Sequence, residues 1–196
     1  VAHLDGKYFI NSTITVKGSP NIVVTGTGEI IASDDLTRAV QIGDVENMVV
    51  NGKIDNLTVT RETHDLSVYS EGVVYKNVVS TLFSNVEVSR FKYNEFFNPE
   101  DGERVGYNTF VNPYIHRGER NTFIFPQGSG WVNENVWIGG RWQTTSSIGS
   151  DFVNHIRIDR PDDGASPPNH NKFFGPSFEG APSGSPGGQN AIRLLR

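Results

Sequence analysis

The chain contains no cysteine in its 196 residues. This absence excludes disulfide bonds, thiolate metal ligands and a cysteine nucleophile. The sequence also lacks any apolar run of about 18 residues, which a membrane-spanning helix would need. Its start holds no basic segment followed by an apolar run, so we predict no secretory signal peptide there and no membrane partner.

Basic residues are not in excess. The chain has 17 Lys and Arg against 22 Asp and Glu, a formal net charge of −5 at pH 7. A nucleic-acid-binding protein typically carries a basic stripe, so nucleic acid is not an expected partner. The five histidines show no metal-ligand spacing, and Gly26-Thr27-Gly28 lacks the third glycine of a dinucleotide-binding motif. We therefore expect neither a metal site nor a cofactor.

Residues that favour helices are sparse, and methionine occurs once. The chain has 21 glycines and 10 prolines, while Val, Ile, Thr, Phe and Tyr supply its apolar and β-branched content. Such a composition favours short strands joined by turns. It predicts an all-β protein.

One short phrase recurs along the chain: an Asn, a run that alternates apolar and polar residues, and then a Gly or a charged corner. Copies include Asn21-Ile22-Val23-Val24, Asn47-Met48-Val49-Val50, Asn85-Val86-Glu87-Val88, Asn121-Thr122-Phe123-Ile124, Asn135-Val136-Trp137-Ile138 and Asn171-Lys172-Phe173-Phe174. The copies at Asn21 and Asn47 stand 26 residues apart, and those at Asn56 and Asn77 stand 21 apart. A period of about 20–25 residues built from strands is typical of a solenoid.

Asparagine suits the corners of a solenoid for two physical reasons. It tolerates left-handed backbone, and its amide can bond an Asn one coil away at the strand spacing of about 4.8 Å. The alternative fold is a β-sandwich or jelly roll, which would show hairpin turns such as Asn-Gly between paired strands. The chain has a single Asn-Gly, Asn51-Gly52, and it lies inside a repeat copy. The solenoid is therefore the preferred prediction.

We expect one domain over residues 1–196, and a fragment of a longer chain, because Val1 opens directly into a strand-like segment. Residues 159–190 are rich in Pro, Gly, Ser and Asp, and they predict loops that extend laterally from one corner. Residues 191–196 predict one more strand, whose open edge would need a cap or a partner chain.

Three features together carry a family resemblance. They are the Asn-led strands, the turn at Gly26-Thr27-Gly28, and the late phrase Asn169-His170-Asn171-Lys172-Phe173-Phe174-Gly175-Pro176-Ser177-Phe178-Glu179-Gly180. The chain thereby resembles the right-handed, single-stranded parallel β-helix of the pectate-lyase-like superfamily, and within it the bacteriophage tailspike and tail-fibre proteins. The resemblance implies a homotrimer, in a virion tail or outside the cell, that binds a bacterial surface polysaccharide and often cleaves it. It carries no catalytic motif that can be transferred residue by residue.

All three tryptophans lie between residues 131 and 142, with arginines nearby. Trp137 alternates with Val136 and Ile138, so we expect it to face outward if those two face the core. A flat indole on a rigid sheet stacks on a sugar ring, and arginine can pair with an acidic sugar. The predicted carbohydrate-binding residues are Trp131, Trp137, Trp142, Tyr114, Arg117 and Arg141. In the competing interpretation, these tryptophans pack against a neighbouring subunit or beneath a loop.

Cleavage of a glycan would need carboxylates or a base with a cation. Glycoside hydrolysis uses two carboxylates, which stacked coils can hold at a suitable separation. The candidates are Glu95, Asp101, Glu103, Glu119, Glu134 and Asp151, of which Asp101, Glu103, Glu119 and Glu134 are placed first. A lyase would instead use pairs such as His116 with Arg117, or His155 with Arg157. An ordinary solvated surface charge is the competing interpretation for each.

Three functions remain open on this basis. The first is a phage tailspike-type protein that binds, and in many such proteins depolymerises, a bacterial surface polysaccharide. The second is a secreted polysaccharide lyase, epimerase or hydrolase with the same fold, acting as a monomer. The third is a non-catalytic trimeric shaft whose only partners are its sister chains.

Overall fold

The computed structural model describes residues 1–18, 20–144, 152–159, 167–180 and 188–194. Within these ranges the chain forms 25 strands in four sheets, and none of its elements is a helix. The described part accordingly contains no helix able to cross a bilayer. Every pair of neighbouring strands runs parallel. The prediction of an all-β protein is confirmed, and the antiparallel hairpins of a β-sandwich are not found among these strands.

The four sheets are named A to D in the order in which the chain meets them. Sheet A contains β1 (Ala2–Leu4), β4 (Val23–Gly26), β8 (Lys53–Asp55), β12 (Leu82–Ser84), β16 (Thr109–Val111), β20 (Val136–Ile138) and β23 (Lys172–Phe174). Sheet B contains β2 (Lys7–Ile10), β5 (Glu29–Ala32), β9 (Thr58–Arg61), β13 (Glu87–Ser89), β17 (Tyr114–His116), β21 (Arg141–Gln143) and β24 (Ser177–Glu179). Sheet C contains β3 (Ile14–Val16), β6 (Arg38–Ile42), β10 (Glu71–Tyr75), β14 (Tyr93–Phe97), β18 (Arg120–Ile124), β22 (Phe152–Ile158) and β25 (Gly188–Leu194). Sheet D contains β7 (Val49–Val50), β11 (Val78–Val79), β15 (Arg104–Gly106) and β19 (Trp131–Asn133).

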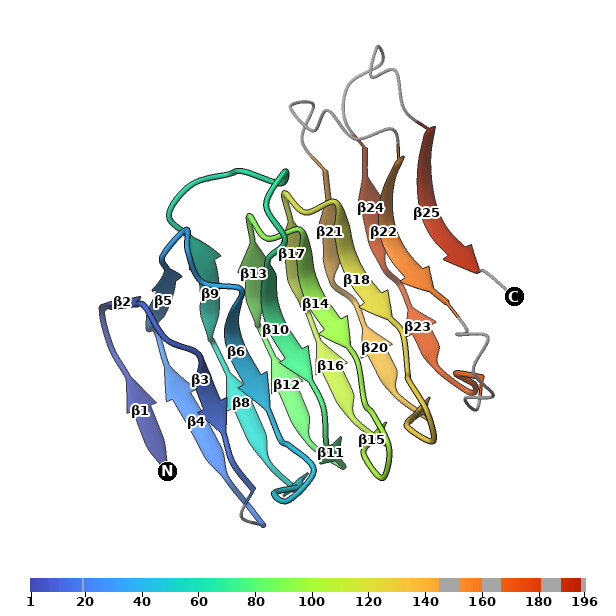
Figure 1. Ribbon diagram of the computed structural model, residues 1–196. Helices are drawn as coiled ribbons and strands as arrows, with labels where there is room; N and C mark the ends of the chain where they lie inside the picture. Colours follow the sequence, from blue (N-terminus) through green and yellow to red (C-terminus); the bar gives the residue numbers. More distant parts are fainter. Residues whose placement is uncertain (19, 145–151, 160–166, 181–187, 195–196) are drawn as a thin grey trace.

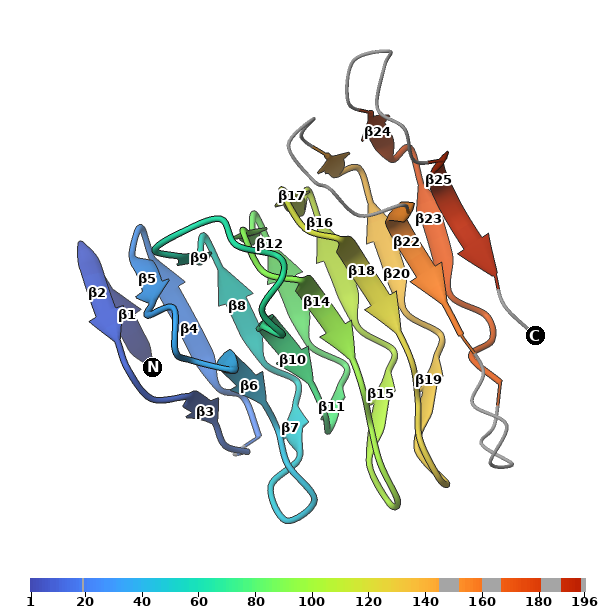
Figure 2. The ribbon, with the colours of Figure 1, turned by 45° about the horizontal axis from the view of Figure 1, so that its top comes forward.

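The chain visits these sheets in rotation. It passes from a strand of sheet A to one of B and one of C, and on four circuits to a strand of D, before it returns to A beside the previous circuit. We call one such circuit a coil. Figure 1 shows the coils side by side from the N-terminal to the C-terminal end, and Figure 2 shows the same order from a second direction.

The length of a coil corrects the predicted period. Equivalent positions on neighbouring coils lie 27 residues apart at Asn108 and Asn135, and 29 apart at Asp55 and Ser84. The predicted period of about 20–25 residues fits some coils, since Ala2 and Val24, and also Glu71 and Tyr93, are register neighbours 22 residues apart. It is too short for the others, because the Asn-led phrase occurs at more than one corner of each coil. Asn56 leads into sheet B, for example, whereas Asn77 leads into sheet D.

Asparagine at the corners is confirmed. Five asparagines have left-handed backbone, with φ angles between 48° and 67°: Asn21, Asn51, Asn56, Asn85 and Asn112. On the next coil after Asn112, Gly139 takes the same corner with φ 66°. These are the residue types that tolerate a positive φ at least cost.

Amide-to-amide bonding between coils is also confirmed, but at other asparagines. The Asn108 amide donates to Asn135 Oδ1 at 2.9 Å, and the Asn135 amide donates to Asn171 Oδ1 at 3.0 Å. Asn94 donates to Asn121 Oδ1 in the same way at 2.9 Å. These side chains are buried, apart from that of Asn171, so the ladders satisfy polar groups inside the stack rather than at its left-handed corners.

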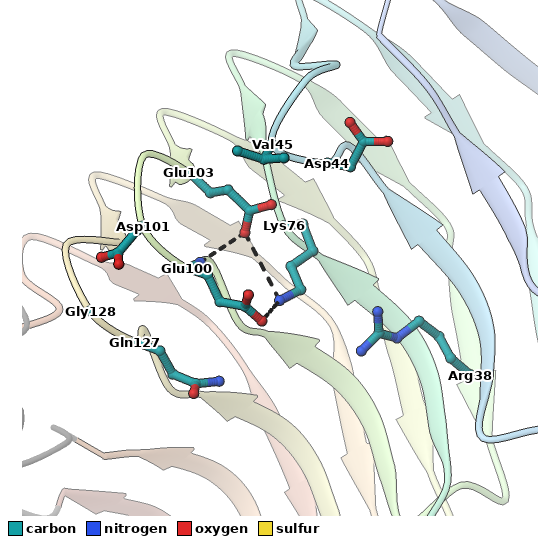
Figure 3. Close-up of a pocket in the computed structure, with 9 residues that line it drawn as sticks. All are labelled: Arg38, Asp44, Val45, Lys76, Glu100, Asp101, Glu103, Gln127 and Gly128. Atoms are coloured by element: carbon teal, nitrogen blue, oxygen red, sulfur yellow. Dashed lines mark hydrogen bonds and ion pairs between the residues drawn. The ribbon is translucent and has the colours of Figure 1, made fainter.

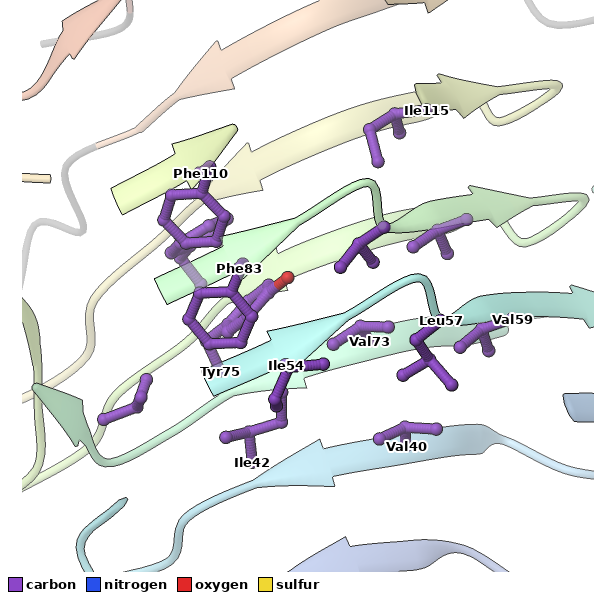
Figure 4. Close-up of a cluster of buried hydrophobic side chains, with 14 of the residues drawn as sticks. Val40, Ile42, Ile54, Leu57, Val59, Val73, Tyr75, Phe83, Phe110 and Ile115 are labelled. Atoms are coloured by element: carbon purple, nitrogen blue, oxygen red, sulfur yellow. The ribbon is translucent and has the colours of Figure 1, made fainter. Parts of the chain in front are cut away.

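Apolar side chains from all four sheets meet in one continuous core, part of which is drawn in Figure 4. Along its length runs a column of rings: Phe83 on Phe110, Phe110 on Trp137, and Trp137 on Phe173. The ring centroids are 4.4–4.8 Å apart and the planes lie within 16° of parallel. Stacking of this kind adds to the stabilisation from burial alone.

The predicted outward position of Trp137 is therefore wrong. Trp137 is fully buried, while Ile138 is 45% exposed. Alternation fixes which residues share a face, but not which face is the inner one. The register with Phe110 and Phe173 decides it, because those rings point into the core. Trp142 is buried as well, with Ile115 and Phe178 as its register neighbours.

Within the loop-rich segment 159–190, β23 and β24 continue sheets A and B, and β25 begins at Gly188. The predicted lateral loops fall largely on residues 160–166 and 181–187, which lie outside the described residues. The predicted final strand is present, but it spans Gly188–Leu194 rather than 191–196.

Candidate functional site

The outer face of sheet C carries two columns of large side chains that continue from coil to coil. In the first column, Arg38, Glu71, Tyr93 and Arg120 are direct neighbours in register. In the second, Gln41, Val74, Phe96, Phe123 and Arg157 are neighbours in the same way. Adjacent strands are about 4.8 Å apart, so each column is a closely spaced array along the axis of the stack.

Aromatic rings and arginines interleave on this face. Phe96 stacks on Phe123 with centroids 5.1 Å apart, and Tyr93 leans on both rings. The guanidinium carbon of Arg120 lies 4.9 Å from the Tyr93 ring and 4.6 Å from the Phe123 ring. Arg157 lies 5.4 Å from the Phe123 ring. The rings form a small apolar cluster on the outer face of the sheet, and the guanidinium groups of Arg120 and Arg157 lie over it.

The buried carboxylate of Glu71 bonds the side chains around it near the N-terminal end of the first column. Glu71 is 2% exposed, and its Oε2 accepts a bond from Arg38 Nε at 2.6 Å. Its Oε1 accepts from the Tyr69 hydroxyl. Burial, and then the bond to Glu71, raise the pKa of Tyr69 well above its ordinary value, so this phenol stays protonated. The pair fixes the Tyr69 ring, which is 47% exposed, edge-on to Tyr93 at 5.4 Å.

Three hollows adjoin on this face. One of about 460 Å³ lies over the aromatic cluster, one of about 640 Å³ lies beside Arg38 and Tyr69, and one of about 630 Å³ lies at the corner leading to sheet D. Tyr69 lines the first two, Arg38 the second and third, and Gln127 the first and third. The hollows thus form one extended depression, which we call the sheet C groove.

The corner hollow exists because one connection is short. Between β10 and β11 the chain uses only Lys76 and Asn77, whereas longer loops precede and follow it on the neighbouring coils. Lys76 is 6% exposed and forms the floor, where it pairs with Glu100 and lies 3.9 Å from Glu103 Oε2 (Figure 3). The floor of the corner hollow therefore carries little unpaired charge, because Lys76 faces the carboxylates of Glu100 and Glu103.

The predicted carboxylates Asp101 and Glu103 both line or adjoin this corner hollow. Each has a local structural task. Asp101 accepts the backbone N–H of Ser129 at 2.5 Å, and this bond lowers its pKa. Glu103 is 6% exposed and accepts the backbone N–H of Glu100 at 2.8 Å.

The other two leading carboxylates lie at separate corners. Glu119 lies 3.6 Å from Lys92 Nζ and 3.9 Å from Arg120 Nε. Glu134 pairs with His170 at 2.8 Å at the corner between β19 and β20. The structure therefore does not bring the four predicted catalytic carboxylates together. Asp151 lies outside the described residues.

Glu95 is buried in the core rather than on a surface. It occupies the inward column of Val40, Val73, Thr122 and Ile156. Its two oxygens accept bonds from the Tyr75 hydroxyl at 3.0 Å and the Thr122 hydroxyl at 2.8 Å. Burial raises the pKa of Glu95 to about 7, because the charged form is poorly solvated there.

The predicted sugar-binding residues are also dispersed. Tyr114 and Arg141 do meet, on the outer face of sheet B, where the guanidinium carbon lies 5.3 Å from the phenol ring. Arg141 is paired there with Glu179. Arg117 is at a left-handed corner with φ 60°, and its carbonyl oxygen lies 3.0 Å from His64 Nε2. Trp131 alone of the three tryptophans has a partly exposed side chain.

The histidine of each predicted lyase pair has another side chain as its neighbour in the structure. His116 Nε2 lies 3.0 Å from Glu87 Oε1 on the outer face of sheet B. His155 is buried, which lowers its pKa to about 4 and keeps it neutral, and it lies beside Asn121. In the described ranges, no three His, Asp or Glu side chains cluster closely enough to hold a metal ion.

Sequence reasoning named Asp101 and Glu103 at the corner hollow but missed the aromatic cluster of the sheet C groove. A usable signal was present in the paired large residues Val73-Val74, Phe96-Phe97 and Phe123-Ile124. Consecutive strand residues point to opposite faces, so one member of each pair must face outward. At a spacing of 27 residues, Phe96 and Phe123 then fall on the same outer column.

Comparison of the chain with protein-family models, with curated proteins and with solved structures finds no match. The chemistry of the groove is therefore the guide to what the protein binds.

Proposed function

We propose that this protein binds a bacterial surface polysaccharide along the sheet C groove, in the manner of a phage tailspike or tail fibre. The observation that carries the proposal is the array of Tyr93 and Arg120 over the largely buried rings of Phe96 and Phe123, which lines an extended depression together with the exposed Tyr69. A polymer of sugars presents alternating apolar faces and hydroxyl groups, which rings and guanidinium groups recognise together. An array that repeats along the stack suits a ligand that repeats in the same direction.

The same proposal includes a more specific fold. We propose that the coils form a right-handed, single-stranded parallel β-helix. The rotation of the chain through parallel sheets and the buried asparagine ladders support it. Crossovers between parallel strands are right-handed in nearly all proteins, which supports the hand. A homotrimer, in a virion tail or outside the cell, completes the proposal.

Replacing Tyr69 with alanine tests the groove. We expect about tenfold weaker binding to the polysaccharide that the protein recognises, because one exposed ring contributes roughly 1 kcal/mol or more by stacking. Arg120→Gln should weaken binding similarly, since it removes the cation between two rings. Binding is measured by calorimetry after a screen of capsular polysaccharides and lipopolysaccharides.

Tyr8→Ala is the matched control. Tyr8 is 39% exposed on sheet B, away from the groove, so its removal should leave affinity unchanged. Equal affinity of wild type, Tyr69→Ala and Arg120→Gln would refute the groove as the binding site. A stable monomer in solution would contradict the tailspike assembly and favour a secreted enzyme. New reducing ends in the same incubations would add depolymerisation, and no binding to any glycan would leave a structural shaft.

A further inference from the structure

A second aromatic surface lies on the outer face of sheet D, beyond the corner hollow of the groove. Trp131 opens β19, and its register neighbour on the preceding coil is Arg104 of β15. Figure 2 shows these two strands side by side. Val132 points into the core, so the Trp131 side chain points outward. Trp137 and Trp142 are fully buried, which leaves Trp131 as the tryptophan that a solute can reach.

The six-membered ring of the indole comes close to a glycine. A Cβ atom added to Gly106 would stand 2.4 Å from Cζ3 and 2.7 Å from Cη2 of the Trp131 ring. Real contacts are never that short, so only glycine allows the ring to rest on the strand. Gly106 does not have a positive φ, so its backbone conformation does not require glycine. Its lack of a side chain instead allows the indole to come close to the strand.

The residue after Gly106 stands at a left-handed corner. Tyr107 has φ 57°, a conformation that costs a bulky residue about 1–3 kcal/mol and persists where surroundings impose it. The fold imposes it on this corner of each neighbouring coil, where Asn51, Ser80 and Glu134 also have positive φ angles. Here the strained corner holds the tyrosine ring edge-on to the indole, 6.2 Å away, and leaves 59% of Tyr107 exposed.

Polar groups surround the two rings. The guanidinium carbon of Arg104 lies 6.0 Å from the indole centroid. Glu134 occupies the same corner as Tyr107 on the next coil, since both backbone N–H groups bond one coil further on. Glu134 is thus about one strand spacing from Tyr107, and its carboxylate is paired with the exposed His170. The rings are flanked by a cation on one strand and a carboxylate at the corner.

We propose that Trp131 and Tyr107, supported by Gly106, form a second sugar-stacking platform that is independent of the sheet C groove. The exposed indole would lie against the C–H face of a pyranose ring, and Arg104 and Glu134 would bond its hydroxyl groups. The choice of a sugar as ligand rests on the proposed function. The location does not, because it follows from the geometry of β15 and β19.

Iodide quenching of tryptophan fluorescence tests the platform on the full chain. With two of the three tryptophans buried, quenching reports on Trp131. Cellohexaose, chitohexaose and maltohexaose at millimolar concentration serve as probes, because stacking reads only the C–H face of a ring. We expect at least one of them to lower the quenching of wild type to the level seen in Trp131→Ala. Unchanged quenching with all three probes would overturn the proposal.

Gly106→Ala keeps the indole but tilts it, and so separates stacking from simple exposure. It should retain quenchable Trp131 fluorescence and lose protection by the sugar, with an unfolding transition close to that of wild type. Protection that survives at full strength in Gly106→Ala would overturn the platform geometry.

The groove variant Tyr69→Ala distinguishes the two proposals. Protection of Trp131 should persist in Tyr69→Ala, because its ring lies on a different sheet. If Tyr69→Ala keeps full polysaccharide affinity while Trp131→Ala loses it, the groove is wrong and the platform stands. If only Tyr69→Ala loses affinity and no probe protects Trp131, the groove stands and the platform is wrong.

Discussion

Replacing Trp137 with alanine should lower the free energy of unfolding by about 3–5 kcal/mol. The indole is fully buried and stacks between Phe110 and Phe173, so its removal breaks the ring column and leaves a cavity in the core. Urea denaturation followed by circular dichroism measures the change. Binding of polysaccharide to the fraction that remains folded should be unaffected.

Trp137→Phe is the matched control for this result. The same column uses phenylalanine on three other coils, and the Trp137 Nε1 has no hydrogen-bond partner in the structure described above. The phenylalanine variant should therefore keep the stack and lose much less stability. An alanine variant as stable as wild type, with lost glycan binding, would restore the outward position that alternation predicts for Trp137.

Glu95→Gln should make the protein more stable at pH 8 and leave it unchanged near pH 4.5. The pKa of Glu95 is about 7 in the fold against an ordinary value of 4.5, so the folded state holds its proton more tightly. Its contribution to stability is complete below pH 4.5, is lost as pH rises from 4.5 to about 7, and stays lost above that. The loss amounts to about 3 kcal/mol. Glutamine stays neutral throughout and should avoid it.

Urea denaturation of both proteins between pH 4.5 and pH 8 checks this expectation. The difference between the two curves matters, because other groups titrate in both proteins alike. Glu46→Gln removes the same charge at an exposed position, and its curve should run parallel to that of wild type. A Glu95→Gln curve that also runs parallel to wild type would show that Glu95 is ionised in the fold at no cost.

The coarse fold followed from the sequence because its causes are local. Few helix formers, frequent glycine, and Asn before alternating runs each favour strands and corners, and Asn56, Asn85 and Asn112 occupy left-handed corners as expected. The period did not follow, because identical phrases serve different corners. Only pairing between distant strands, such as Ile54 with Phe83, establishes which copies are equivalent.

The site was harder to predict, for a physical reason visible at Trp137 and Glu95. In a strand of three residues, alternation leaves two choices of inner face, and residue type does not always decide between them. Here an apolar pair, Val136 and Ile138, lies outward while an indole lies inward. At Glu95 a carboxylate takes a place that valine holds on earlier coils, because two hydroxyl groups bond it.

The parallel register between coils also determines how this molecule responds to force. Strands lie across the stack, so hydrogen bonds between coils point along it, and the first and last described strands lie at its opposite ends (Figure 1). Tension between those ends would load the bonds along their own direction and peel coils away one at a time. Each detached coil of 22 to 36 residues would release roughly 70–120 Å of extended chain. The stack would therefore lengthen stepwise under tension, with the size of each step set by the length of the coil that detaches.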